Sequence, residues 1–347
     1  TDSKSSLRDT WQVLWPISEF YAYSDQRVNN ANQNPAFLSV FDGEPFKNAP
    51  KKNTDSNRSN DIKADDAFSV ASNVQNLMFE NISTIHFDKK AGTLVDTYNG
   101  KKGSTVTTYD AAYSIEALRI FQRAIDALPV GYGSADGAKS LESAQGKEAL
   151  SLIKTQADFL VSKLKGKDGL YANTYDIAKA TKSGKSVGTQ FAVVRGLTAA
   201  YLATKSENYR DEARALVLAI EKNMFDKNIG TYVDASKEYT PYSIAAVSGG
   251  LRDAINHLKN EGAEKESALE LQNLTQRFTS WFQLVVNGNK LNEGAQLAEW
   301  LLDSGEFVKA NDLNDSNADG DNVPSIVSAG GKNGTAMTMA GKVKLSK

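Results

Sequence analysis

The chain has 347 residues, of which 40% are hydrophobic and 24% are charged, and its formal net charge is −2. This length and composition allow a large buried core, in one large domain or in two ordinary ones. The small negative charge does not favour nucleic-acid binding, which relies on neutralising phosphates. The absence of cysteine excludes disulfides and thiolate metal sites, and no apolar run approaches the roughly 20 residues of a membrane-spanning helix.

The N-terminal part divides into a helical segment and an irregular arm. Residues 7–25 hold apolar positions typical of a helix, and Pro16 predicts that this helix breaks or starts there. Residues 26–64 are rich in Asn, Lys, Asp and Pro, which predicts an irregular segment. The polar start at Thr1 and the Asn-, Ser- and Thr-rich loops lead us to expect a secreted, periplasmic or cell-surface protein.

From residue 65 onward, two kinds of helix alternate along the chain. Charged amphipathic helices are predicted by apolar residues at helical spacing, and more apolar, Gly- and Ala-rich helices are predicted between them. The amphipathic helices are expected at 65–83, 145–164, 208–225 and 263–286, and the apolar helices at 107–128, 187–204 and 241–260.

A ten-residue phrase occurs twice between these helices. Residues 87–96 read FDKKAGTLVD and residues 225–234 read FDKNIGTYVD, with seven positions identical, and a looser copy lies at 165–173. Gly92 and Gly230 stand where a tight turn would form, and β-favouring residues follow each of them, so the phrase predicts a short hairpin. A phrase that repeats in this way indicates a repeated unit of two helices and one β turn.

Amphipathic helices that alternate with apolar ones predict an all-α fold, either an α/α toroid or a plain solenoid of helical hairpins. The stretch 189–234 resembles the repeats of six-hairpin toroids such as the N-acylglucosamine 2-epimerase-like proteins, and the resemblance extends over roughly residues 66–304. It implies a toroid domain at 65–304, between an arm at 1–64 and a polar tail at 305–347. Epimerase-type sites use several histidines, whereas this chain has only His86 and His257.

The resemblance places a site on the face of the ring where the phrases enter the inner helices. Tyrosine offers an apolar face and a polar hydroxyl, which suits stacking on sugar rings. The alternative is that these tyrosines pack in turns and seams. The residues expected to bind ligand near this mouth are Tyr98, Tyr109, Tyr171, Tyr175, Tyr232, Tyr239, Tyr242 and Gln190.

Two sets of residues are candidates for catalysis. A glycosidase needs two carboxyl groups about 5 to 10 Å apart, for which Asp110 and Glu293 are the candidates. A polysaccharide lyase needs a base and a cation that holds the uronate carboxylate, for which Tyr113 and Arg195 are the candidates. The structural alternative is that Asp110 caps its helix. His86, alone in an alternating run, is expected to be a packed or exposed residue and not a catalyst.

The tail contains a partial calcium loop. Asp315, Asn317, Asp319 and Asp321 alternate around Gly320, as oxygen ligands of Ca²⁺ do in the first half of such a loop. Residue 326, at the twelfth position, is Ile rather than Glu, so a complete EF-hand is not predicted. A flexible acidic tail is the alternative to Ca²⁺ binding.

Taken together, these features predict a secreted carbohydrate-active or glycan-binding protein whose partner is a polysaccharide or oligosaccharide. Whether it is an enzyme stays open, with a glycoside hydrolase or a polysaccharide lyase as the forms considered. One alternative is a non-catalytic surface or extracellular assembly protein that self-associates through its terminal arms. Another is a helical-repeat scaffold that binds peptides.

Overall fold

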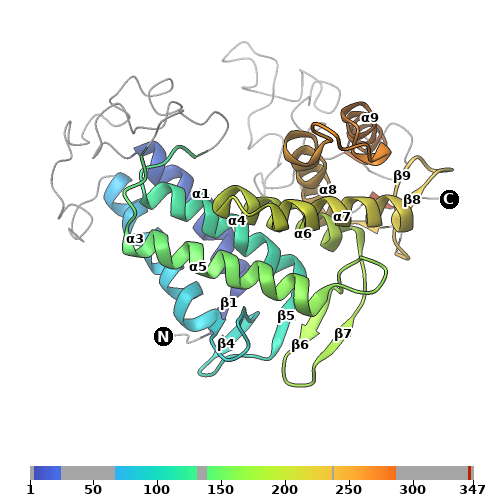
Figure 1. Ribbon diagram of the computed structural model, residues 1–347. Coiled ribbons are helices and arrows are strands. Elements are labelled where there is room, and N and C mark those ends of the chain that lie inside the picture. Colours follow the sequence, from blue (N-terminus) through green and yellow to red (C-terminus); the bar gives the residue numbers. More distant parts are fainter. Residues whose placement is uncertain (1–3, 25–66, 131–138, 237, 287–342, 345–347) are drawn as a thin grey trace, which may run out of the picture. The chain divides into compact units, whose positions relative to one another are not determined.

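The computed structural model describes residues 4–24, 67–130, 139–236, 238–286 and 343–344 (Figure 1). The predicted irregular arm, the predicted domain boundaries near 64 and 304, Glu293 and the calcium-loop residues lie outside these ranges. The chain forms two compact units. The first comprises Thr1–Lys167, Tyr171–Gly184 and Arg195–Ala213, and the second comprises Asp168–Leu170, Lys185–Val194 and Arg214–Lys347.

In the first unit, helix α1 contacts α3 and α4, and α4 also contacts α5 (Figure 1). Helix α4 is buried on nearly all sides, so it is an inner helix, whereas α5 exposes one charged face. The rings of Phe79 on α3 and Phe121 on α4 stack at 4.3 Å between centroids. The bounds are α1 Leu7–Ser24, α3 Ala67–Glu80, α4 Thr108–Ile125 and α5 Ala144–Phe159.

The prediction that Pro16 breaks or starts a helix is wrong, because α1 runs through it. Proline removes one backbone hydrogen bond and crowds the preceding turn. In α1 the proline lies on the exposed side, while Leu14 and Tyr21 on the other side are fully buried. The burial of these apolar side chains offsets the lost bond, so tertiary packing overrides the local preference.

Helices α6 (Val187–Thr204) and α7 (Glu207–Met224) each contribute residues to both units. Helix α6 has the bounds that the sequence predicts for an apolar inner helix. Its residues from Phe191 to Ala200 are all buried. No helix in the described part of the chain is both long and apolar enough to span a membrane.

Both copies of the repeated phrase form the predicted hairpins. Phe87 pairs with Leu94 in the first copy, and Phe225 pairs with Tyr232 in the second. Gly92 has a φ of 66°, a conformation that favours glycine and permits the tight turn. The hairpin strands are β2 Phe87–Asp88, β3 Thr93–Leu94, β8 Phe225–Asp226 and β9 Thr231–Tyr232.

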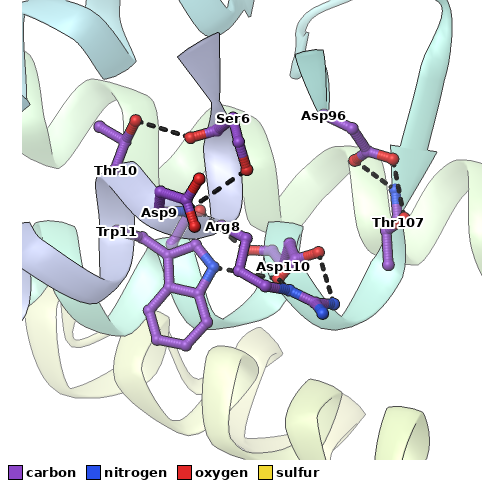
Figure 2. A network of polar contacts seen from close by, with 9 residues as sticks. Ser6, Arg8, Asp9, Thr10, Trp11, Asp96, Thr107 and Asp110 are labelled. Carbon is purple, nitrogen blue, oxygen red and sulfur yellow. Dashed lines mark hydrogen bonds and ion pairs between the residues drawn. The ribbon is translucent and has the colours of Figure 1, made fainter.

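The last aspartate of each phrase holds the start of a helix. Asp96 accepts hydrogen bonds from the backbone N–H and the hydroxyl of Thr107, both at 2.7 Å, and Thr107 directly precedes α4 (Figure 2). Asp234 accepts a hydrogen bond from the backbone N–H of Val187, the first residue of α6, at 3.0 Å. These bonds satisfy N–H groups that have no partner within the helix.

Short strands complete the connections of the first unit. β1 pairs with β4, and β5, β6 and β7 form a three-stranded antiparallel sheet. β5 leads directly into α4, so this sheet positions the start of an inner helix. The bounds are β1 Lys4–Ser6, β4 Thr97–Asn99, β5 Thr105–Thr107, β6 Thr174–Asp176 and β7 Thr181–Ser183.

The second unit packs α8 (Pro241–Asp253) against α9 (Leu271–Trp281). Helix α8 begins with a capping box formed by Thr240 and Ser243. The fully buried ring of Trp281 meets Tyr239 edge-on at 5.0 Å. β10 (Glu238–Tyr239) pairs with β11 (Val343–Lys344).

Four helices end in a short π-helical segment, and a 3₁₀ turn precedes α9. These segments are η2 Asn81–His86, η3 Leu160–Leu164, η4 Ala254–Leu258, η5 Ser267–Leu269 and η6 Phe282–Val286.

Candidate functional site

The first turn of α4 carries a buried carboxylate that the start of α1 holds in place. Asp110 accepts hydrogen bonds from Arg8, at 2.9 Å from Nε and 3.0 Å from Nη2, and from Trp11 Nε1 at 3.1 Å (Figure 2). Both carboxylate oxygens are therefore engaged, in the bidentate geometry that makes such pairs strong. The structural alternative for Asp110 was a helix cap, but the residue that precedes the helix is Thr107.

Aromatic side chains from α1 and α4 stack beside this ion pair. The ring of Tyr113 lies 4.7 Å from that of Tyr109 and 4.9 Å from that of Trp11, and it lies 6.2 Å from that of Trp15. Residues four apart on a helix share one face. Helix α1 therefore contributes Trp11 and Trp15, and α4 contributes Tyr109 and Tyr113, to one interface between the two helices. Trp15 is the half-buried member of the stack, whereas the other three are buried.

Arg195 on α6 completes this cluster. Its guanidinium carbon lies 5.1 Å from the ring centroid of Trp15 and 5.2 Å from that of Tyr113, which is cation–π geometry. Its Nη1 donates to the hydroxyl of Tyr113 at 3.4 Å, and its Nη2 lies 3.8 Å from Glu116 Oε1. The structure thus brings together Tyr113 and Arg195, the pair that the sequence suggested for lyase chemistry.

The Glu116 carboxylate contacts two guanidinium groups. Besides its contact with Arg195, it accepts two hydrogen bonds from Arg119, at 2.9 and 3.0 Å. Glu116 therefore links the guanidinium groups of Arg119 and Arg195. We call the following residues the aromatic cluster: Arg8, Trp11, Trp15, Tyr109, Asp110, Tyr113, Glu116 and Arg195.

Gly196 allows α4 and α6 to approach closely enough for the cluster to form. A Cβ at this position would lie 2.8 Å from the carbonyl oxygen of Ala112 and 3.1 Å from its Cα. These contacts are shorter than side chains tolerate, so the absence of a side chain sets the distance between the two helices. Arg195, the preceding residue, reaches Tyr113 because of this close approach.

Three of the predicted ligand-binding tyrosines lie in the core instead of on a surface. Tyr171 is fully buried, and Tyr232 and Tyr239 are each 2% exposed. Burial raises the pKa of all three phenols above the ordinary value. Tyr232 contacts the rings of Phe191 and Phe225 edge-on. These side chains stabilise the fold and present no face on which a sugar ring could stack.

The remaining predicted ligand-binding residues do not gather in one place. Tyr98 in β4 and Tyr175 in β6 are half-buried, and Tyr242 in α8 is 44% exposed. Gln190 is fully buried, and its amide donates to the backbone carbonyl of Ser186. Tyr109 is the only one of these predicted residues that belongs to the aromatic cluster. Glu293, the proposed partner of Asp110, lies outside the described residues.

His86 is a structural residue, as the sequence suggested. It is fully buried, with Nδ1 donating to the carbonyl of Val95 and Nε2 accepting from the hydroxyl of Ser5, both at 2.8 Å. Burial, assisted by the nearby charge of Lys102, lowers the pKa of the ring, while the bond to Val95 acts in the opposite direction. The buried ring links Ser5 to Val95, which gives His86 a structural role.

Sequence reasoning missed Arg8, Trp11 and Trp15. The available signal was the spacing of the two tryptophans, four residues apart on a helix that also carries a cation one turn earlier. The 102 residues between Arg8 and Asp110 hid their pairing. Within the described ranges, no group of three or more His, Asp or Glu side chains is arranged to hold a metal ion. The predicted calcium ligands lie outside these ranges and stay a prediction.

Comparison with known proteins shows the fold. No family model and no curated protein matches the chain. A solved cellobiose 2-epimerase from Bacillus thermoamylovorans is similar, with a TM-score of 0.52 and 13% identity over 82% of this chain and 61% of that one. A cellobiose 2-epimerase from Spirochaeta thermophila has a TM-score of 0.49 and 12% identity, over 81% and 60%. The GH76 α-mannanase BT2949 from Bacteroides thetaiotaomicron has a TM-score of 0.46 and 14% identity, over 82% and 76%.

The first of these likenesses confirms the predicted fold class, an all-α fold of the α/α toroid type with short hairpins between its helices. At 13% identity it shows the fold alone. The chain spans about three fifths of the length of the two epimerases.

Proposed function

We propose that this protein is a secreted carbohydrate-active protein that binds a polysaccharide or oligosaccharide at the aromatic cluster. The observation that carries the proposal is the position of Arg195, whose guanidinium carbon lies 5.1 Å from the ring centroid of Trp15 and 5.2 Å from that of Tyr113, with a hydrogen bond to the Tyr113 hydroxyl. Trp15 is the half-buried ring of the cluster, so its face would stack on the apolar face of a sugar ring, and the Arg195 guanidinium beside it would bind a carboxylate or hydroxyl of that sugar. The cellobiose 2-epimerase of similar fold supports a carbohydrate ligand.

Among reactions on glycans, the cluster favours elimination from a uronate over hydrolysis. In an elimination, a cation binds the uronate carboxylate and a nearby base removes the proton on the adjacent carbon. The next ring carbon then loses its glycosidic oxygen, so that a C=C bond forms in the uronate and the neighbouring sugar leaves as an alcohol after it takes up a proton. Arg195 and Tyr113 offer these two groups in contact with each other. A hydrolase needs a free carboxyl pair, whereas both oxygens of Asp110 already accept hydrogen bonds from Arg8 and Trp11.

The test is a panel of neutral and uronate-containing polysaccharides, assayed for reducing ends and for the absorbance of unsaturated products. We expect unsaturated products from uronate-containing glycans only. Tyr113→Phe and Arg195→Lys should each lower the rate by about 100-fold or more, the usual contribution of a general base or of an aligned cation.

Arg277→Lys is the matched control. Arg277 also lies over an aromatic ring, 3.7 Å from the centroid of Phe225, and also pairs with a glutamate, Glu221, but it lies in the second unit. We expect this variant to keep full activity. Glycan binding without turnover would reject the elimination and leave a binding protein, and neither binding nor turnover on any glycan would favour the non-catalytic assembly protein.

A further inference from the structure

A pocket of about 390 Å³ lies in the first unit at the far end of α4 from Asp110. It is bounded by the last turn of α4, the start of α5 and the end of α6. Arg123 in its wall is 13 residues after Asp110, which corresponds to about 20 Å along a helix. The pocket therefore lies at the other end of α4, and it meets the aromatic cluster where Arg119 in its wall is bonded to Glu116. Its proposed role does not depend on the proposed function. The charged residues in its wall are the cations Arg119, Arg123, Lys147 and Lys205 and the carboxylates Asp126 and Glu142.

Two of the four cations in the wall have carboxylate partners. Arg119 is bonded to Glu116, and the Lys147 ammonium lies 3.6 Å from Glu142. The other two cations, Arg123 and Lys205, are not paired with a carboxylate among the described residues. The Arg123 side chain donates a hydrogen bond from Nε to the carbonyl of Pro129, and within the same ranges the Lys205 ammonium has no partner.

The remaining carboxylate in the wall, Asp126, is not paired with either of these cations. It accepts hydrogen bonds from the backbone N–H and hydroxyl of Ser143, at 2.8 and 2.6 Å, and from the amide of Gln122 at 2.9 Å. These bonds place Asp126 at the N-terminus of α5, where an anion is stabilised. With its charge counted, four cations in the wall face two carboxylates, which leaves an excess of positive charge.

Arg119 and Arg123 stand one turn apart on the same face of α4. Like charges at this spacing destabilise a helix. Burial, together with the charge of Arg119, lowers the pKa of the Arg123 guanidinium. Glu116 already pairs with Arg119, and an anion bound beside Arg123 would offset the remaining repulsion.

We propose that this pocket binds a small organic phosphate monoester, with Arg123 and Lys205 holding the phosphate. Leu128, Leu150 and Leu202 also line the pocket and would contact the carbon body of the ligand. A phosphate monoester carries a charge close to −2 at neutral pH, which matches the two cations. A volume of about 390 Å³ with three leucines in its wall suits a small organic molecule rather than a bare ion.

Isothermal titration with phenyl phosphate, inorganic phosphate, benzoate and phenol tests the proposal on the full chain. We expect phenyl phosphate to bind most tightly, because it alone combines the dianion with an apolar body. Its affinity should fall as salt is added. Lys205→Gln and Arg123→Gln should each weaken binding by about tenfold or more, the usual contribution of a hydrogen bond to a charged group.

Lys163→Ala is the matched control, because it removes an exposed cation from η3, outside the pocket. Lys205 is exposed, so Lys205→Gln keeps the test valid if loss of the Arg123–Pro129 bond disturbs folding. The proposal would be overturned if phenyl phosphate did not bind, or if phenol bound equally well. It would also be overturned if Lys205→Gln, Arg123→Gln and Lys163→Ala lost the same amount of affinity for phenyl phosphate. Tighter binding of benzoate would overturn the choice of a phosphate.

Discussion

The carboxylate of Asp110 accepts two hydrogen bonds from the guanidinium of Arg8, at 2.9 and 3.0 Å, although 102 residues separate the two positions. This ion pair fixes the first turn of α1 against the first turn of α4. The two partners are unequally buried, since the side chain of Arg8 is 39% exposed and that of Asp110 is 7% exposed. The consequences of removing each partner are therefore unequal as well.

Arg8→Ala should destabilise the protein by about 2–3 kcal/mol, because it leaves the buried Asp110 charge with only the Trp11 bond. Asp110→Asn should cost less, about 1–2 kcal/mol, because the partly exposed Arg8 can be solvated. Urea unfolding curves measure both free energies. Lys147→Ala, which removes a pair whose side chains are 64% and 73% exposed, should change stability by less than about 0.5 kcal/mol. A larger loss of stability in Asp110→Asn than in Arg8→Ala would contradict this account.

His86 should make stability depend on pH. Its pKa is lowered in the folded protein, chiefly by burial, and is about 6.5 in the unfolded chain. As the pH falls below 6.5, the unfolded chain takes up a proton that the folded ring still excludes. The free energy of unfolding should therefore decrease, by at most about 1.4 kcal/mol per pH unit from this group.

Urea unfolding between pH 8 and pH 5.5 measures this dependence. His86→Gln should flatten it. His257→Gln is the companion variant, because it measures the contribution of the other histidine in the chain. An unchanged slope in His86→Gln would show that the imidazole is not the titrating group.

Gly196→Ala should destabilise the first unit. Alanine is the better helix former by about 1 kcal/mol, but its Cβ would lie 2.8 Å from the carbonyl oxygen of Ala112. Forcing α4 and α6 apart should cost about 1–3 kcal/mol and should also move Arg195 away from Tyr113. Thermal unfolding and the activity assay measure these two effects. A more stable variant would mean that the helices can separate without strain.

Tyr113→Phe separates a chemical role of the hydroxyl from a structural one. The hydroxyl accepts a long bond, 3.4 Å, from Arg195, while the ring makes the stacking contacts. We expect a loss of stability below about 1 kcal/mol together with the 100-fold loss of elimination activity. Tyr209→Phe, which removes a 2.7 Å bond to Asp158 outside the cluster, should leave activity unchanged. Equal activity losses in both variants would argue against a base at Tyr113.

Lys205→Gly should raise stability while weakening phosphate binding. Lys205 follows the last residue of α6 with a φ of 58°, in the left-handed region that glycine occupies without strain. Relief of this strain should stabilise the protein by about 1 kcal/mol, and loss of the ammonium should remove its contact with the anion. Thermal unfolding with and without phenyl phosphate measures both. Full retention of binding would exclude a role for the ammonium.

The repeated phrase and the helix pattern made the fold predictable from the sequence. Gly92 and Gly230 marked the two hairpins, and the apolar run at 187–204 gave the bounds of α6, because local preference and packing agree there. Pro16 was misread, since the burial of Leu14 and Tyr21 outweighs its local effect.

The candidate site was less predictable, because it depends on contacts between distant residues. Tyr113 and Arg195 were chosen for their chemistry, yet only the packing of α4 against α6 brings them together. Tyr171, Tyr232 and Tyr239 were chosen for the same reason and prove to be buried. Residue type does not distinguish a ring that faces a ligand from one that faces the core.

The two copies of the repeated phrase place different demands on the order in which the chain folds. Asp96 bonds to a residue only 11 positions away, so the first hairpin can hold the start of α4 as soon as both have been synthesised. Asp234 reaches back over 47 positions to Val187, so its bond closes a loop that contains all of α7. Long loops carry a larger entropic cost and close more slowly. The first copy of the phrase should therefore make its bond to a helix start early in folding, and the second copy should make its bond later.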